Sequence, residues 1–382
     1  MNEHTPFISD RLFSTIDTKI RVFHIGGRGA MGPVECLLQL GESMALTIFE
    51  ANIDNSQESS SENTWGKYEQ FINDYAHRFN VEVSFVPKGI SNYPGTKKFY
   101  INVMPDCSSL LKIHQGSAKY QRNNGPYRII WGEICKPKRT VDIEVTSLDE
   151  LHAIGEIPLP HFLSMDIQGA EYDAFEGTLK ALHGDLLGIV TEVEFHELYE
   201  GQKLFCDQFS LLRKHRFILF DLLNSEHWYS GPILGKGCLM VSEALFLRDF
   251  QYFVNKDNDD PITLLSNLSK LAIVAFCFDR KSYAFEILEY ILNNWYDKWD
   301  MFLKQNNTKY LHGLMTFYNG AKTVKQKEEN EVPTYEKFMT KVNHHTIPTI
   351  CPHCDESLFI SGKGSWVCPY CKKIFVIDEP TI

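Results

Sequence analysis

The chain has no long apolar segment and no excess of positive charge. Its longest apolar run, Leu271–Phe278, is far shorter than the roughly 20 residues of a membrane-spanning helix. The N-terminus shows no basic start followed by an apolar stretch, so we expect no secretory signal. With 38 Lys and Arg against 49 Asp and Glu, the net charge of −11 disfavours general binding to nucleic acid or anionic lipid. We therefore expect a cytoplasmic protein with no membrane span and no nucleic-acid partner.

Strand and helix patterns alternate from about Lys19 to Asp249. Buried-strand patterns at Arg21–Gly27 and Leu46–Asn52 are the first of this series. Alternation of this kind is typical of a mostly parallel sheet covered by helices on both faces. The last two strand patterns, Phe217–Leu223 and Gly237–Leu247, are joined without a helical pattern. We therefore expect an α/β fold whose sheet ends in an antiparallel hairpin.

Changes in composition predict four segments along the 382 residues. We assign residues 1–250 to the sheet domain and 251–320 to a helical appendage, where Leu264, Leu268 and Leu271 recur at helical spacing. Residues 321–346 are polar and are predicted to be a linker. Residues 347–382 form a small cysteine module.

A glycine pattern follows the first predicted strand. Gly27, Gly29 and Gly32 fit G-x-G-x-x-G and precede a predicted helix, where glycines allow a ligand to approach the backbone. Glu50 ends the second predicted strand, where a carboxylate can accept hydrogen bonds from ribose hydroxyls. This combination predicts a nucleoside cofactor rather than a purely structural turn. The loop itself does not separate a nicotinamide dinucleotide from S-adenosylmethionine.

Later motifs separate the two cofactors. The block Ser164-Met-Asp-Ile-Gln-Gly-Ala-Glu171 lies at a predicted strand-to-helix junction, after Cys107-Ser-Ser-Leu-Leu-Lys112 and before Thr191-Glu-Val-Glu194. This ordered set resembles the FkbM family of S-adenosylmethionine-dependent methyltransferases over about Arg21 to Val241. The resemblance implies a class I methyltransferase sheet, which is Rossmann-like, and O-methylation of a sugar or polyketide hydroxyl. We expect a carbohydrate or glycan-precursor acceptor.

The resemblance also implies roles for individual residues. Gly27, Gly29 and Gly32 would line the cofactor, Glu50 would hold its ribose, and Asp166 would face the methyl-transfer site. The family usually has an acid in the first strand, where this chain has His24. An NAD-dependent Rossmann enzyme and a non-catalytic methyltransferase-like scaffold are the alternative interpretations.

Acidic residues and a histidine are predicted to surround the acceptor. Glu192, Glu194 and His196 alternate along the sequence, so a strand would place them on one face, near Asp166. Such a cluster can act as a general base or hold a divalent cation through oxygen ligands. The structural alternative is that these acids only cap helices or pair with arginines.

Four cysteines predict a structural zinc site. Cys351, Cys354, Cys368 and Cys371 form two Cys-x-x-Cys pairs, which suit one tetrahedral Zn²⁺ with no open position. The sequence between the pairs reads as a hairpin. Because Ile347–Ile382 has no basic excess, we expect this ribbon or the helical segment to contact protein rather than nucleic acid.

One basic segment stands out in the acidic chain. Lys112–Arg139 holds seven Lys and Arg but only one acid, Glu133. The functional interpretation is that it attracts an anionic acceptor, such as a phosphorylated sugar. The simpler interpretation, which we favour, is a solvated loop.

Overall fold

The structure is a computed structural model. It describes residues 19–26, 32–51, 64–124, 127–232, 234–305, 309–331, 347–350, 353, 357–360, 364–367, 371 and 373–377. The chain divides into two compact units, with the boundary between Leu314 and Met315. None of the described helices is long and apolar enough to cross a membrane.

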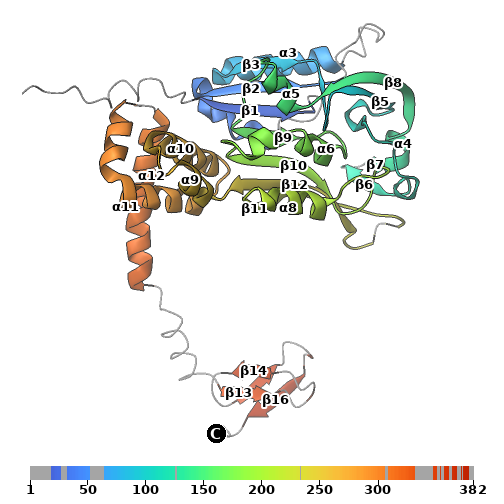
Figure 1. Cartoon of the computed structure of the whole chain (residues 1–382). Coiled ribbons are helices and arrows are strands. Elements are labelled where there is room, and N and C mark those ends of the chain that lie inside the picture. Colours follow the sequence, from blue (N-terminus) through green and yellow to red (C-terminus); the bar gives the residue numbers. More distant parts are fainter. Residues whose placement is uncertain are drawn as a thin grey trace, which may run out of the picture. The chain divides into compact units, whose positions relative to one another are not determined.

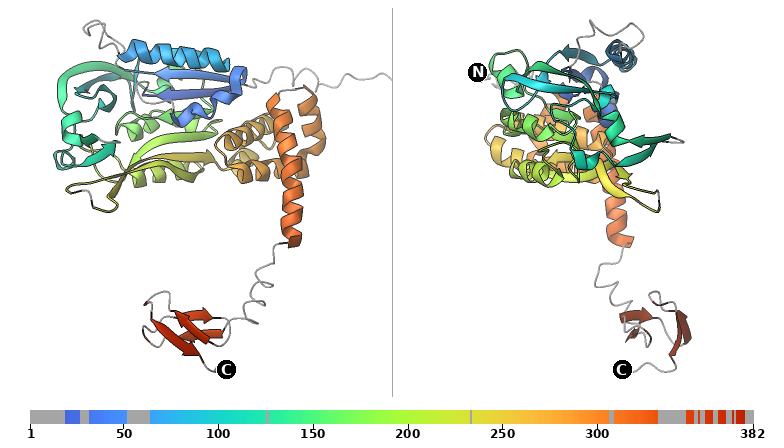
Figure 2. Two further views of the ribbon diagram at one scale, coloured as in Figure 1. Left: turned by 180° about the vertical axis from the view of Figure 1, so that it is seen from behind. Right: turned by 90° about the vertical axis from the view of Figure 1, so that its right-hand side faces the viewer.

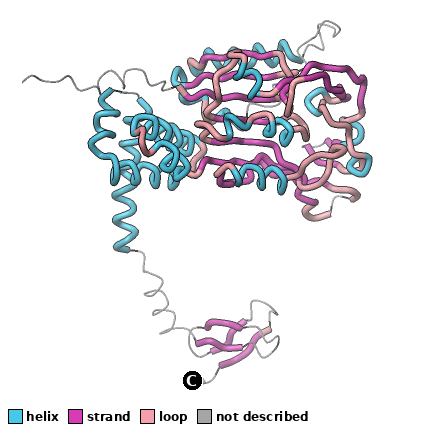
Figure 3. The backbone as a smooth tube through the Cα atoms, viewed as in Figure 1, coloured by secondary structure: helices cyan, strands magenta, loops and turns pink. Residues whose placement is uncertain are grey.

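The first unit is built on a seven-stranded, mostly parallel sheet, as predicted (Figures 1 and 3). Its strands stand in the order β11-β12-β10-β9-β1-β2-β3. β1, β2, β3, β9 and β10 are parallel, whereas β12 pairs antiparallel with both β10 and β11. The bounds are Ile20–Ile25 (β1), Met44–Phe49 (β2), Glu82–Val86 (β3), Phe162–Met165 (β9), Gly188–Glu194 (β10), Phe217–Trp228 (β11) and Cys238–Arg248 (β12).

One of these strands, β11, is longer than the sequence predicts. β11 continues to Trp228 through register shifts, so residues 229–237 alone connect it to β12. Because bulges bend a strand and break its period of two, the alternation of apolar residues fades before the strand ends. The connection is therefore shorter than the predicted loop.

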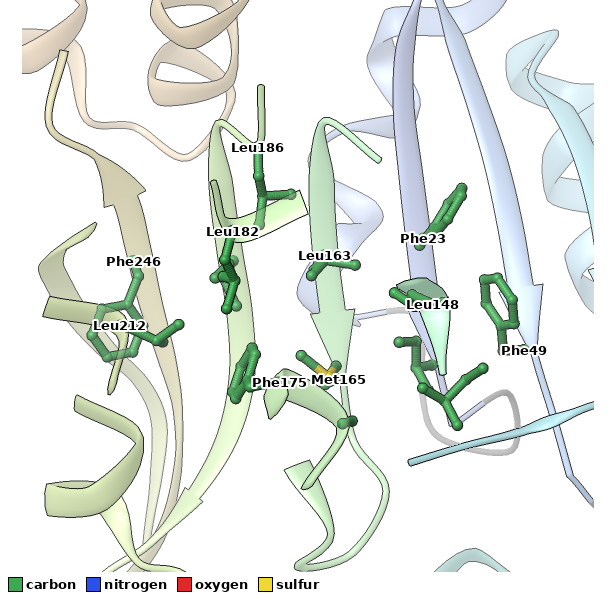
Figure 4. Close-up of a cluster of buried hydrophobic side chains, with 14 of the residues drawn as sticks. Phe23, Phe49, Leu148, Leu163, Met165, Phe175, Leu182, Leu186, Leu212 and Phe246 are labelled. Atoms are coloured by element: carbon green, nitrogen blue, oxygen red, sulfur yellow. The ribbon is translucent and has the colours of Figure 1, made fainter. Parts of the chain in front are cut away.

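Short helices cover one face of the sheet. Phe23, Leu163 and Phe246 point from the strands toward the helices that carry Leu148, Phe175, Leu182 and Leu212 (Figure 4). The described helices of this unit before β11 are α2 (Gly32–Glu35), η2 (Leu38–Ser43), α3 (Thr64–Phe79), η3 (Pro105–Cys107), η4 (Gln115–Ser117), α4 (Trp131–Ile134), α5 (Leu148–Ala153), α6 (Glu171–Glu176), α7 (Leu179–Leu182) and α8 (Phe205–Lys214).

Smaller strands are inserted between β3 and β9. They form a three-stranded sheet in the order β4-β8-β5 and a separate hairpin of β6 and β7. Their bounds are Gly89–Ile90 (β4), Gly95–Asn102 (β5), Gln121–Asn124 (β6), Tyr127–Ile130 (β7) and Pro137–Thr146 (β8). The predicted basic segment therefore forms the β6–β7 hairpin, α4 and the start of β8.

Three helices follow β12: α9 (Phe250–Asp257), α10 (Pro261–Cys277) and α11 (Lys281–Gln305). They gather at the end of the sheet opposite β6 and β7 (Figures 1 and 2). α10 begins at Pro261 because the Asp260 carboxylate caps the free N–H groups of Ile262 and Thr263. The ring of Phe278 stacks on Phe162 of β9 at 5.2 Å between centroids, so the helices extend the core of the sheet.

Arg248, the last residue of β12, ties the helices to the sheet. Its buried guanidinium donates to the carbonyl oxygens of Leu186 and Leu182, each at 2.9 Å, and also to that of His215. The Tyr283 hydroxyl of α11 donates to the Arg248 carbonyl oxygen at 2.6 Å. These bonds satisfy buried polar groups where the strand ends.

The remaining elements are a long helix and four short strands. α12 (Lys309–Glu331) continues into residues 321–346, the segment predicted to be a linker. The first residues of that segment are therefore helical. β13 (Ile347–Ile350) pairs with β14 (Ser357–Ile360), and β15 (Gly364–Val367) pairs with β16 (Ile374–Ile377), both antiparallel. The predicted hairpin between the cysteine pairs would have joined β14 to β15. The pairing instead joins the strands that flank each Cys-x-x-Cys pair.

Candidate functional site

The candidate site lies where the central parallel strands end. In register, Ile25 of β1 stands beside Phe49 of β2 and Met165 of β9. The next residues on each strand, Gly26, Glu50 and Asp166, therefore meet at one edge. The chain order reverses between β1 and β9, and ligands of open α/β sheets bind at the carboxyl ends of strands at such a switch point.

Gly26 allows this edge to close tightly. Its amide donates to the Phe49 carbonyl oxygen at 3.1 Å, and the Asp166 amide donates to the Ile25 carbonyl oxygen at 3.0 Å. Its φ is +99°, and a Cβ at this position would lie 1.7 Å from the Asp166 carbonyl oxygen. Only glycine fits both restraints. Gly26 was not singled out in the sequence, although it is the first of two adjacent glycines after β1.

A pocket of about 630 Å³, partly open to solvent, lies at this edge. It is lined by both Glu50 and Asp166. The remaining walls combine apolar side chains with polar ones, including Phe49, Ile90, Phe99, Lys88, Asp106, Ser108 and Gln168. Apolar walls with a few polar side chains among them are usual for a ligand-binding site.

The turn after β9 fixes the position of Asp166. Gln168 adopts a φ of +57° and Gly169 a φ of +94°. The Glu171 carboxylate, buried at the start of α6, accepts from the backbone N–H of Ile167 at 2.8 Å and of Gly169 at 3.3 Å. Left-handed backbone at a residue other than glycine is costly, and such strain is concentrated at functional sites.

Gln168 joins two carboxylates. Its side-chain Nε2 donates to Asp166 Oδ1 at 2.7 Å and to Glu192 Oε2 at 3.1 Å. Its Oε1 accepts from the Tyr199 hydroxyl at 2.8 Å. The structure thus brings Asp166 and Glu192 together, from the ends of neighbouring strands. Neither Gln168 nor Tyr199 was predicted from the sequence to take part in the site.

Burial and mutual repulsion disfavour negative charge in this acidic group. Burial, followed by the charge of Asp166, raises the pKa of Glu192 well above its ordinary value, and burial also raises the pKa of Asp166. Burial raises the pKa of Glu171 to about 7. Glu194 is 1% exposed, and burial followed by the charge of Glu171 raises its pKa well above the ordinary value.

His196 does not share the strand face of the two glutamates. β10 ends at Glu194, so His196 lies in the bend that follows and is exposed. Its ring is tilted against that of Tyr120, with 6.4 Å between centroids. The alternation of Glu192, Glu194 and His196 holds only while the strand continues, and this part of the prediction was wrong.

The glycine loop is described only in part. Gly27 and Gly29 lie outside the described residues, and Gly32 is exposed as the first residue of α2.

His24 does not line the pocket. It is fully buried within β1, where its Nδ1 lies 3.0 Å from the Ser164 hydroxyl, and burial lowers its pKa to about 4.

The basic segment is partly neutralised. Arg122 makes two bonds to the Glu226 carboxylate, at 2.5 and 2.6 Å, and Lys112 lies 3.5 Å from Glu200. Arg128, Lys136 and Lys138 are exposed.

Each predicted zinc-binding pair falls between two paired strands. Cys351 and Cys354 follow β13, and Cys368 and Cys371 follow β15. Only Cys371 belongs to the described residues. The zinc site therefore stays a prediction.

Comparison with known proteins places this geometry in context. Residues 48–219 match the methyltransferase FkbM domain. The matched segment runs from β2 into β11, so it contains Glu50, the Asp166–Glu171 turn and β10, but not β1 or the glycine loop. It is narrower than the predicted resemblance, and it indicates a methyltransferase domain in this part of the chain.

Other comparisons add less. The curated proteins gave no match. A crystal structure of methyltransferase FkbM from Methylobacillus flagellatus is similar at 13% identity and a TM-score of 0.32. That similarity covers 62% of this chain and 47% of the other. The chain therefore spans about half the length of this neighbour.

Proposed function

We propose that the chain is an S-adenosylmethionine-dependent methyltransferase that methylates a hydroxyl of a sugar or glycan precursor. The proposal rests on one observation above all: Glu50 and Asp166 line the same pocket at the switch point of the sheet. The domain match supports methyl transfer. The choice of a sugar hydroxyl rests on the family resemblance.

The pocket residues fit the cofactor. Glu50 follows β2 and would accept hydrogen bonds from the ribose, while Phe49, Ile90 and Phe99 supply apolar surface for the adenine. When bound, S-adenosylmethionine supplies a methyl group on a positively charged sulfur, which suits a pocket that Asp106 and Asp166 also line.

A hydroxyl acceptor has to lose its proton as its oxygen bonds to the methyl carbon. Asp166 lines the pocket and would accept it, because burial raises its pKa and brings the carboxylate closer to neutral pH; Glu192 is joined to Asp166 through Gln168. S-adenosylmethionine would supply the methyl group and leave as S-adenosylhomocysteine, and the carboxylate would hold the proton that the hydroxyl loses. We still interpret the basic segment, in which Arg128, Lys136 and Lys138 are exposed, as a solvated loop, with attraction of an anionic acceptor as the alternative.

For the second unit we propose a structural zinc ribbon. Two Cys-x-x-Cys turns, each between paired strands, suit four thiolates around one ion. We also propose domain divisions at residues 250, 320 and 346. The ribbon or the helical segment would contact a protein partner, and the chain would be cytoplasmic.

Calorimetric titration of the full chain with S-adenosylmethionine, S-adenosylhomocysteine and NAD tests the proposed function. We expect the first two to bind and NAD not to bind. Glu50→Gln should weaken their binding by at least about tenfold, the loss of one charge-assisted hydrogen bond. Glu42→Gln, an exposed acid just before β2, is the matched control. Binding of NAD alone would support a dinucleotide enzyme, and binding of none would support a non-catalytic scaffold.

A further inference from the structure

The acidic group beside the pocket contains more carboxylates than proton transfer requires. Asp166, Glu171 and Glu192 each place one oxygen within 4.8 Å of the others. Oxygens at these separations can surround a single cation at the roughly 2.0–2.6 Å that Mg²⁺ and Ca²⁺ prefer. A cluster of acids is common without any ion, so this spacing alone does not identify a site.

Glu194 supplies an independent observation. It is 1% exposed, and its Oε2 has no hydrogen-bond partner. Two residues before it, Glu192 carries its carboxylate on the same face of β10. Among the charged groups, Glu171 raises the pKa of Glu194 most, and Asp166 raises it next most. Glu194 is therefore a buried carboxylate on the face of β10 from which Glu192 joins the other acids.

The four carboxylates lack a compensating positive charge. In the described part of the chain, none of them forms an ion pair with Lys, Arg or His. Two cationic residues of the basic segment pair with other acids: Lys112 with Glu200, and Arg122 with Glu226. A buried carboxylate without a partner costs several kcal/mol unless it takes up a proton or a cation.

We infer that Asp166, Glu171 and Glu192 bind a hard divalent cation such as Mg²⁺ or Mn²⁺, with Glu194 as a further oxygen beside it. The donor set contains only carboxylate oxygens, with no thiolate or imidazole, which selects hard cations over Zn²⁺. The inference rests on the proposed function, because the cation would lie next to the acceptor end of the pocket, which Asp166 and Gln168 line. Three protein ligands leave positions in an octahedral shell for water or the acceptor oxygen.

Mn²⁺ is a suitable probe, because it prefers oxygen ligands and has a paramagnetic resonance signal. The full chain, with its zinc content already measured, is titrated with Mn²⁺ by calorimetry and by loss of the free-ion signal. We expect one saturable site that Mg²⁺ competes for. Glu192→Gln and Glu194→Gln should each weaken Mn²⁺ binding by about tenfold or more. Glu176→Gln, an exposed acid on α6, should leave it unchanged.

Thermal unfolding gives a second measurement that does not depend on activity. Without metal, Glu192→Gln should unfold at a higher temperature than the wild type, because it removes one of several like charges. Mn²⁺ should raise the unfolding temperature of the wild type but not of this variant. Absence of saturable Mn²⁺ binding, or equal binding by all variants, would overturn the inference, and the acids would then be protonated or would face an organic cation.

The two proposals fail separately. Binding of S-adenosylmethionine without Mn²⁺ binding, in titrations repeated with S-adenosylhomocysteine present, would overturn the cation site and leave the methyltransferase. Mn²⁺ binding without S-adenosylmethionine binding would overturn the proposed function and leave an acidic cation site.

Discussion

We predict that His24, the buried histidine of β1, lowers the free energy of unfolding at mildly acidic pH. His24 is 0% exposed, its Nε2 has no partner, and burial lowers its pKa from 6.5 to about 4. The folded state therefore keeps His24 neutral between pH 6.5 and 4, whereas the unfolded state takes up a proton there. Stability contributed by the neutral ring is complete above pH 6.5 and is lost as the pH falls toward 4.

The two pKa values set the size of the effect. Between pH 7 and pH 5, proton uptake by the unfolded state alone lowers the free energy of unfolding by about 2 kcal/mol. Other groups titrate in the same range, and the raised pKa values of Glu192 and Glu194 act in the opposite direction. The contribution of His24 is therefore measured against a variant that does not titrate.

Urea unfolding of the wild type and of His24→Asn at pH 7, 6 and 5 isolates this contribution. Asparagine keeps a polar atom near the Ser164 hydroxyl but has no ionisable group. We expect the free energy of unfolding of the wild type to fall by about 2 kcal/mol more than that of the variant over this range. If both lose stability in parallel, the ring is not held neutral in the folded state, and the placement of His24 inside the sheet is wrong.

Two further predictions concern the glycine edge and the ribbon. Gly26→Ala should lower the free energy of unfolding by at least about 3 kcal/mol, because its Cβ would overlap the Asp166 carbonyl. Gly155→Ala is the control: this glycine has a φ of +77° but open space around it, so the substitution should cost only about 1 kcal/mol. Similar losses for the two variants in urea unfolding would show that the β1–β9 contact is looser than described. Metal analysis should find about one zinc per chain, and Cys371→Ser should release it; a folded second unit without metal would contradict the ribbon.

The sequence predicted the sheet because its signal is local and repeated. Apolar strand patterns identify β1, β2 and β9, and their alternation with helix patterns indicates a mostly parallel sheet. The block around Asp166 also identified the strand end at the centre of the site. These features depend on residues that are close in the sequence.

The missed parts of the site depend on contacts between distant segments. Tyr199 reaches Gln168 from a loop after β10, and nothing in either segment alone predicts that bond. Gly26 is required by the approach of β9, 140 residues later, rather than by its own turn. His196 was misplaced because alternation continues in the sequence beyond the end of the strand.

The bonds around Arg248 bear on where the sheet domain ends. Cutting the chain after β12 would remove Tyr283, which accepts the amide of Phe250 and donates to the Arg248 carbonyl. It would also expose Phe162 of the central strand, which Phe278 now covers. The hydrophobic core of the segment that matches the methyltransferase domain is therefore completed by the helices that follow β12, and a chain cut before them would need another cover for that core.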